Sequence, residues 1–138
     1  ASLRIESGPM RTGLQLILAG TGEVLVPYLS RVESRWEATI GLLGRSQLAE
    51  DTGLLIPHCR IVHTWGMRFS LDLIYLTAHD PIRKGVENLQ PWRLSAAREA
   101  VQVMELPAGK GAQLGLRVGQ AVAVCPTPDQ KPGNGACS

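Results

Sequence analysis

Residues 71–77, which read Leu-Asp-Leu-Ile-Tyr-Leu-Thr, constrain the fold more strongly than any other stretch of the chain. In an extended chain the side chains alternate between two faces, and here both faces are apolar. One face carries Leu71, Leu73 and Tyr75, and the other carries Ile74 and Leu76. A strand that is apolar on both faces must lie inside a layered or closed structure. We therefore predict a central, buried strand over these residues.

The rest of the chain consists of short β-forming runs separated by glycine and proline. Further strands are predicted at residues 14–18, 24–26, 54–56, 61–65, 82–89, 99–106 and 121–125. Gly20 and Gly22 favour a hairpin turn between the first two runs, and Pro27 is expected to end that hairpin because proline cannot donate to a strand ladder. The run 82–89 is polar enough to be an edge strand.

One long and one short helical segment accompany these strands. Residues 30–43 carry apolar side chains at helical spacing, and Ser34 with Glu37 makes a capping box. A short helical turn is predicted over residues 107–114, and a loop is predicted over residues 91–95. One clear helix among many short strands indicates an α+β, mostly β fold, in the form of a barrel-like or curled-sheet domain.

The length of 138 residues fits one domain, with a loose lead-in over 1–12, a globular unit over 13–125 and a flexible, proline- and glycine-rich tail over 126–138. A composition of 44% apolar and 19% charged residues is typical of a soluble protein. The net charge of +2 is too small to favour nucleic acid, and no apolar run approaches the roughly 20 residues of a membrane span. We expect a soluble protein that is cytoplasmic, or exported after loss of a signal not present in this chain.

The three cysteines, Cys59, Cys125 and Cys137, match neither a metal-binding spacing nor a disulfide framework. Their odd number favours a reducing compartment, although pairing of Cys59 with Cys125 is compatible with the sequence. The sequence has no phosphate-cradling loop, nucleophile elbow or zinc-protease motif, and we expect no cofactor.

Five short motifs occur in an order that resembles one known family. They are Gly41-Leu42-Leu43-Gly44-Arg45, Gly53-Leu54-Leu55, Cys59 to Asp72, Glu105-Leu106-Pro107-Ala108-Gly109 and Gly115-Leu116-Arg117-Val118-Gly119. This set is similar to the bacterial and archaeal family called domain of unknown function 192. The resemblance implies a small, mostly β domain and no assigned activity. In many members the last turn ends Gly-Asp, whereas this chain has Gly119-Gln120, which keeps an amide in place of the charge.

The segment from residue 59 to residue 77 concentrates most of the reactive side chains. If residues 59–67 are extended, then one face carries Cys59, Ile61, His63, Trp65 and Met67. Thiolate, imidazole and thioether are ligands that suit Cu(I), but buried Cys and Met are commonly core residues. We favour the core interpretation, and no metal is expected.

Two carboxylates are predicted within apolar strand faces. Asp72 shares a face with Ile74, and it would complete a nucleophile–base–carboxylate set with Cys59 and His63. We favour the alternative that Asp72 accepts backbone N–H groups at the start of its strand.

Glu105 is the second of these carboxylates, and with Asp72 it would form the paired site that general acid–base catalysis uses. The favoured alternative is that Glu105 lies at a strand end and binds backbone amides or Arg117.

The arginines Arg68, Arg93 and Arg98 could converge with Trp65 and Trp92 into a groove for an anionic or sugar-like ligand. The alternative is that Trp92 covers the open end of the barrel.

We expect a small ligand- or partner-binding module rather than an enzyme. Its cleft is predicted to be lined by His63, Trp65, Arg68, Asp72, Trp92 and Arg93. The partner would be a small molecule or a protein, not nucleic acid. The alternative is a thiol- or metal-dependent enzyme that uses Cys59 and His63 with Asp72 or Met67.

Overall fold

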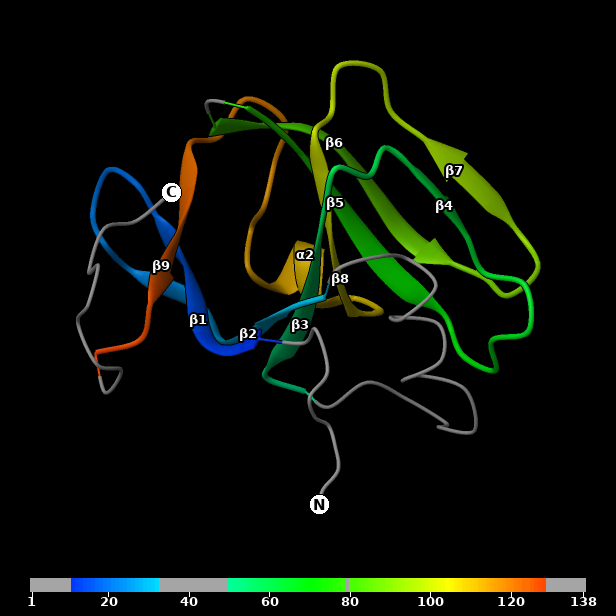
Figure 1. Cartoon of the computed structure of the whole chain (residues 1–138), viewed down its shortest axis with the longest axis horizontal. Helices are drawn as coiled ribbons and strands as arrows, with labels where there is room; N and C mark the ends of the chain where they lie inside the picture. Colours follow the sequence, from blue (N-terminus) through cyan, green and yellow to red (C-terminus); the bar gives the residue numbers. More distant parts are fainter. Residues whose placement is uncertain (1–10, 33–49, 79, 129–138) are drawn as a thin grey trace.

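The computed structural model of the chain describes residues 11–32, 50–78 and 80–128 (Figure 1). These residues form nine strands and one short helix. The elements are β1 (Arg11–Leu18), β2 (Val24–Arg31), β3 (Thr52–Pro57), β4 (Ile61–His63), β5 (Leu71–Thr77), β6 (Asp80–Leu89), β7 (Leu94–Ala96), β8 (Gln102–Pro107), α2 (Lys110–Gln113) and β9 (Val122–Pro126). The predicted α+β, mostly β class is confirmed.

Seven strands form one curled sheet in the order β6-β5-β8-β3-β2-β1-β9, and β4 pairs with β7 in a separate two-stranded sheet. The curl brings the two edges of the large sheet together without closing it. Two backbone hydrogen bonds bridge this gap: Ile82 donates to the Gln120 carbonyl at 2.9 Å, and Gly119 donates to the Ile82 carbonyl at 2.8 Å. The predicted curled sheet is thus confirmed, and its edges are joined through a turn and not through a strand ladder.

Two apolar clusters pack on the two faces of the large sheet. Strand β5 contributes to both clusters, with Leu73 and Tyr75 in one and Ile74 and Leu76 in the other. Its first six residues are all buried, and it lies between β6 and β8. Each fully buried Leu or Ile contributes roughly 1.5–3 kcal/mol of hydrophobic stabilisation, so a strand buried on both faces anchors the whole sheet.

The small β4–β7 sheet covers the first of these clusters. Val62 and Ala97 are buried in it together with Tyr75, and the Tyr75 hydroxyl donates to Ser95 Oγ at 3.1 Å. Figure 1 shows β4 and β7 beside each other on the side of the molecule away from β1 and β9. The outer face of this two-stranded sheet is therefore turned to solvent.

The predicted hairpin between β1 and β2 is confirmed, but Pro27 does not end it. Leu14 pairs with Leu29 and Leu16 pairs with Val26, so one residue of β1 faces two of β2, including Pro27. Such a bulge leaves one residue without a ladder hydrogen bond, and a proline there removes no bond that the sheet needs. Strand β2 consequently runs on to Arg31 and pairs in parallel with β3.

Other predicted boundaries shift at the small sheet. The strand expected over 61–65 ends at His63, and the expected loop over 91–95 contains the start of β7. The predicted edge strand over 82–89 is confirmed as β6, and the helical turn over 107–114 contains α2. Of the helix predicted over 30–43, residues 30 and 31 belong to β2, and residues 33–43 lie outside the described residues. Strand β1 begins at Arg11, within the expected lead-in.

Candidate functional site

The outer face of the β4–β7 sheet and the loops that adjoin it carry five of the six residues predicted to line a cleft, and the exception is Asp72. His63 pairs with Leu94 and Ile61 pairs with Ala96, so these side chains point the same way, opposite to the buried Val62. Leu94 is 62% exposed and Ile61 is 55% exposed. Large apolar side chains on a strand face normally pack inward, and here they meet solvent.

Thr64 holds two loops together at the end of this sheet. Its backbone N–H donates to the Arg93 carbonyl at 2.9 Å, and its own carbonyl accepts the N–H groups of Trp92 at 3.0 Å and Met67 at 3.2 Å. The buried hydroxyl donates to the Gln90 carbonyl at 2.6 Å and accepts the Arg93 N–H at 2.9 Å. Thr64 thereby fixes Trp92 and Arg93 beside the loop that follows β4.

Sequence reasoning missed Thr64, because a hydroxyl residue after a short strand looks like any other loop residue. The one available signal was its position between His63 and Trp65, both of which were predicted to lie at the site.

Trp65 stacks on His63, with ring centroids 4.5 Å apart and an interplanar angle of 22°. Trp65 is 50% exposed, whereas Met67 is only 3% exposed and belongs to the core. The chain turns between them at Gly66, whose φ is 84°. Residues 59–67 are therefore not one extended strand, and the expectation that Trp65 and Met67 share one face is wrong. Glycine adopts positive φ without the steric cost that a Cβ brings.

Trp92 has a backbone conformation that a bulky residue rarely adopts. Its φ is 64°, in the left-handed region, and its side chain is 64% exposed. For a residue with a Cβ this conformation costs roughly 1–2 kcal/mol, and glycine would avoid the cost. The adjacent Arg93 is also exposed. The loop thus holds a large indole in solvent in a strained conformation.

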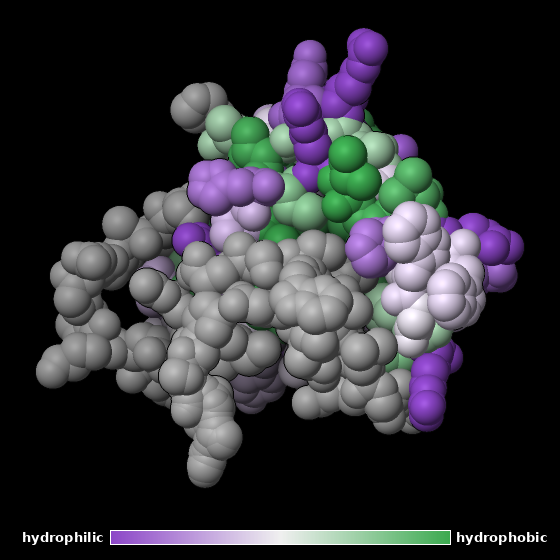
Figure 2. All heavy atoms as spheres, turned by 45° about the vertical axis from the view of Figure 1, so that its right-hand side comes forward, coloured by the Kyte–Doolittle hydropathy of each residue, from purple (hydrophilic) through white to green (hydrophobic). Residues whose placement is uncertain are grey.

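Together these side chains form one exposed surface, which we call the tryptophan surface. It consists of Ile61, His63, Trp65, Trp92 and Leu94, with Arg68 and Arg93 as exposed charged neighbours in the same loops. Figure 2 shows green and pale side chains gathered on the side that carries β4 and β7, with purple hydrophilic side chains around them. The predicted convergence of tryptophans and arginines is compatible with this placement.

Asp72 does not lie on the tryptophan surface. It is 1% exposed and shares the face of β5 that carries Ile74, opposite to the face that β4 and β7 cover. Its Oδ1 accepts the Asn88 N–H and its Oδ2 accepts the Gly111 N–H, both at 2.8 Å. Both donors are backbone groups, as the favoured interpretation predicted, but they come from β6 and α2 and not from the start of β5. The cleft predicted around His63 and Asp72 is thus divided between two faces of the sheet.

Glu105 is fully buried within β8, on the other side of the sheet from Asp72. Along the β5–β8 ladder Glu105 pairs with Leu73, whereas Asp72 pairs with Leu106. Directly paired residues point the same way and neighbours point oppositely, so the two carboxylates face apart. The paired-carboxylate arrangement is absent, and the expected position of Glu105 at a strand end is wrong, since it lies inside β8 (Gln102–Pro107).

Among the described residues, the cysteines Cys59 and Cys125 do not assemble a nucleophilic or metal site. Cys59 is a half-buried thiol that packs on the core and donates to the Ile61 carbonyl at 3.3 Å. Cys125 is disulfide-bonded, and Cys59 is not its partner. Since Asp72 faces away from His63, the proposed set of Cys59, His63 and Asp72 is not brought together. In the part of the chain that the structure describes, no three His, Cys, Asp or Glu residues group as metal ligands.

In the turn before β9, Gln120 stands where many members of the resembled family have the aspartate of a Gly-Asp motif. The Gln120 side-chain oxygen accepts the Arg117 N–H at 3.2 Å, and the Arg117 carbonyl accepts the Gln120 N–H at 3.1 Å. An amide oxygen therefore caps the turn without a charge. Arg117 is exposed and is not the partner expected for Glu105.

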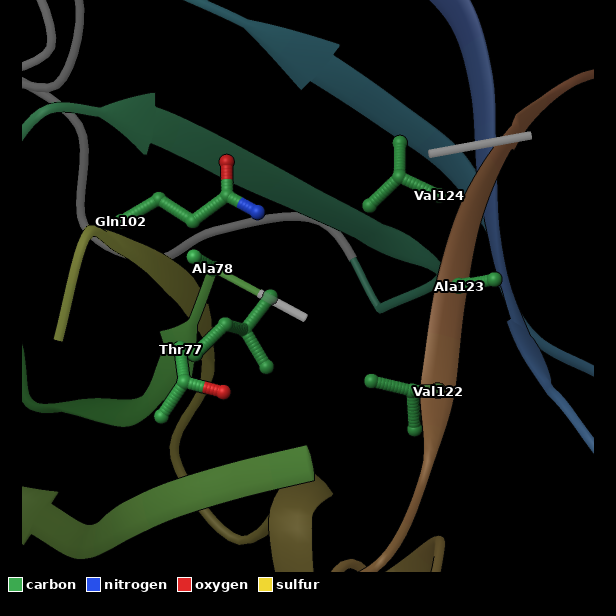
Figure 3. A pocket seen from close by; sticks show the side chains of 7 residues that line it. Thr77, Ala78, Gln102, Val122, Ala123 and Val124 are labelled. Atoms are coloured by element: carbon green, nitrogen blue, oxygen red, sulfur yellow. The ribbon is translucent and has the colours of Figure 1, made fainter. Parts of the chain in front are cut away.

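A small hollow lies between the end of β5 and β9, with a volume of about 20 Å³. In Figure 3 the side chains of Thr77 and Gln102 lie across from Val122 and Val124 of β9. A cavity needs about 10–15 Å³ to hold a water molecule, so this hollow has room for one water and not for a ligand.

The architecture described above defines a class of small β domain with one open, curled sheet. The chain is similar to a protein from Sinorhizobium meliloti that is provisionally assigned as a transcription regulator, with a TM-score of 0.66, 23% identity, and coverage of 86% of this chain and 96% of that one. It is also similar to a protein of unknown function from Novosphingobium aromaticivorans, with a TM-score of 0.67, 18% identity, and coverage of 88% and 90%. At these identities the likeness shows the fold alone.

Residues 19–124 match the model of the domain of unknown function 192 family, described as "Uncharacterized ACR". The chain belongs to this family, as its motifs indicated. No curated protein matches the sequence. Within the described residues, no helix combines the length and the apolar character needed to cross a membrane.

Proposed function

We propose that the protein is a partner-binding module whose tryptophan surface recognises an acidic protein segment carrying large apolar side chains. The observation that carries this proposal is the conformation of Trp92, which is held at a φ of 64° while the residue stays 64% exposed. Backbone strain persists where the surrounding structure enforces it, and such sites are concentrated at ligand-binding positions. A buried ring would explain the strain through packing, but this ring has no such explanation.

The composition of the surface supports a protein partner. Indole rings and arginines are enriched at the centres of protein interfaces, where they supply large contact areas at low entropic cost. Trp65 and Trp92 lie in loops that Thr64 ties together, so little ordering is needed when a partner docks. The exposed outer face of the β4–β7 sheet also suits an extended segment.

The charge of the surface favours an acidic partner. Residues 59–71 and 90–98, which make up the small sheet and its loops, contain no Asp or Glu. The same segments contain Arg60, Arg68, Arg93 and Arg98, all of them exposed. Arginine forms paired hydrogen bonds to carboxylates, so this concentration of positive charge steers acidic segments towards the tryptophans.

A selection from a displayed library of random peptides tests the proposal. We expect the enriched peptides to carry several Asp or Glu residues together with Leu, Phe or Trp. The Trp92→Ala and Arg93→Ala proteins should remain folded and bind these peptides at least tenfold more weakly, which corresponds to about 1.4 kcal/mol. Tyr28→Ala is the matched control, since Tyr28 is also 64% exposed but lies on β2.

Three results would overturn the proposal. The enriched peptides could be neutral or basic, their binding could survive Trp92→Ala, or Tyr28→Ala could weaken it equally. Specific binding of duplex DNA in place of acidic peptides would assign the arginines to nucleic-acid recognition.

A further inference from the structure

A second hollow lies on the opposite side of the sheet, next to α2, and we call it the α2 hollow. Its volume is about 200 Å³. It is larger than cavities of about 150 Å³ that hold a benzene molecule. Its lining comes from β5, β6, α2 and the segment before β9. The tryptophan surface and this hollow share no residue, so the two can be tested separately.

Gly85 on β6 borders the α2 hollow, and nothing among the residues that the structure describes requires a glycine there. A Cβ at this position would come no closer than 3.8 Å to Ile74 Cδ1 and 4.0 Å to the Leu73 carbonyl, which are ordinary contacts, and its φ is not in the left-handed region. Gly85 pairs regularly with Ile74, and its neighbours are also in register, so it makes no bulge. A glycine within a strand weakens the strand, and where there is no bulge or tight bend it often marks a place where a ligand or another backbone approaches closely.

The rest of the lining has both apolar and charged parts. The apolar part is formed by Ile74, Ile82, Leu116 and Val118. The charged part consists of the exposed Glu87 and Arg117 and the buried Asp72. Asp72 already accepts two backbone N–H groups, so it fixes the wall of the hollow, and Glu87 and Arg117 are the charges that solvent reaches.

We propose that the α2 hollow binds a small zwitterion with a branched aliphatic body, which is the chemistry of a free branched-chain amino acid. The apolar lining takes the aliphatic body, and removing this surface from water supplies the main driving force. Arg117 binds the carboxylate through its guanidinium, and Glu87 binds the ammonium group. The opposite charges at the border select a zwitterion over an uncharged hydrocarbon.

Three probe molecules separate the parts of this proposal: L-leucine, isopentylamine, which lacks the carboxylate, and 4-methylpentanoate, which lacks the ammonium group. Titration of each into the isotopically labelled protein is followed through the amide resonances of Asn88 and Gly111, which flank Asp72. L-leucine should shift these resonances in a saturable way and bind more tightly than either analogue. Arg117→Gln should weaken L-leucine and 4-methylpentanoate, and Glu87→Gln should weaken L-leucine and isopentylamine.

Variants at Gly85 provide the control for fold. Gly85→Leu fills the hollow and should abolish L-leucine binding, while the melting temperature stays the same or rises because leucine is a better strand residue than glycine. Gly85→Ala leaves most of the space and should retain binding. The proposal is overturned if millimolar L-leucine shifts no resonance near the hollow, or if Gly85→Leu binds L-leucine as the wild type does.

Discussion

Asp72 on β5 and Gly111 on α2 are joined by a 2.8 Å hydrogen bond from the Gly111 N–H to Asp72 Oδ2. Oδ1 of the same carboxylate accepts the Asn88 N–H from β6, also at 2.8 Å. One buried side chain therefore ties a strand, its edge neighbour and the short helix together. This double role as acceptor explains why an acidic residue lies within an otherwise apolar strand, since a buried carboxylate requires hydrogen-bond donors.

We first predict that Gly111→Ala destabilises the protein. A Cβ at this position would lie 3.1 Å from Asp72 Oδ2, so the carboxylate must move and its bond to the Gly111 N–H must lengthen. We expect the free energy of unfolding to fall by about 1–2 kcal/mol, measured by chemical denaturation. Gly20→Ala is the control, because nothing lies within 4 Å of a Cβ there. Equal stability of the two variants would contradict this account.

The second prediction concerns the carboxylate itself. In Asp72→Asn one oxygen becomes an NH₂ group, which faces a backbone N–H and leaves that donor unsatisfied. We expect a loss of about 1–3 kcal/mol in the free energy of unfolding. Asp51→Asn should cost less than about 1 kcal/mol, because Asp51 is 60% exposed and makes only a 3.7 Å ion pair with Lys110. The interpretation fails if Asp72→Asn is no more harmful than this control.

Thr64→Val is the third test, since it keeps the shape of the side chain and removes the hydroxyl. The Arg93 N–H and the Gln90 carbonyl would both lose a buried partner. We expect a destabilisation of about 2–3 kcal/mol by thermal or chemical unfolding, together with faster amide hydrogen exchange at Arg93. Thr21→Val, which removes only an exposed 3.2 Å bond to the Glu23 N–H, should have little effect.

The fourth prediction separates binding from stability at Trp92. Replacement by glycine removes the strain of a φ of 64° and deletes an exposed ring. We expect Trp92→Gly to be at least as stable as the wild type, with a gain on the order of 1 kcal/mol, and to lose peptide binding. The alternative is that Trp92 covers an open end of the sheet. In that case its ring stabilises the fold, and Trp92→Gly would lower the melting temperature clearly.

The sequence was sufficient to predict the parts of the fold that depend on local alternation. Strand β5 has the predicted bounds, and both of its faces are buried as predicted. A strand that is apolar on both faces has to be covered on both of them. The effect of Pro27 could not be predicted correctly. The sheet tolerates a proline there because of a bulge, and this bulge is defined only by the pairing with the partner strand. Strand β7 was missed because residues 94–96 become a strand only through pairing with β4.

The sequence could predict which loop side chains are exposed, but it could not predict that the residues of the expected cleft lie on two faces of the sheet. Trp92 and Arg93 stand out in the sequence as residues that a polar loop would expose. Asp72 points away from these residues because β4 and β7 cover only the other face of the sheet. This arrangement is set by tertiary packing and not by the local sequence. Thr64 was overlooked for the same reason, because its partners lie 26 and 29 residues further along the chain.

The pairing of β1 with both β2 and β9 has a consequence for biosynthesis. While residues 122–126 are still inside the ribosome, the outer side of β1 is an open edge whose N–H and C=O groups can pair with another chain. The nascent domain therefore remains vulnerable to aggregation until β9 emerges, and dependence on a ribosome-associated chaperone should be greatest for chains that stall just before that point.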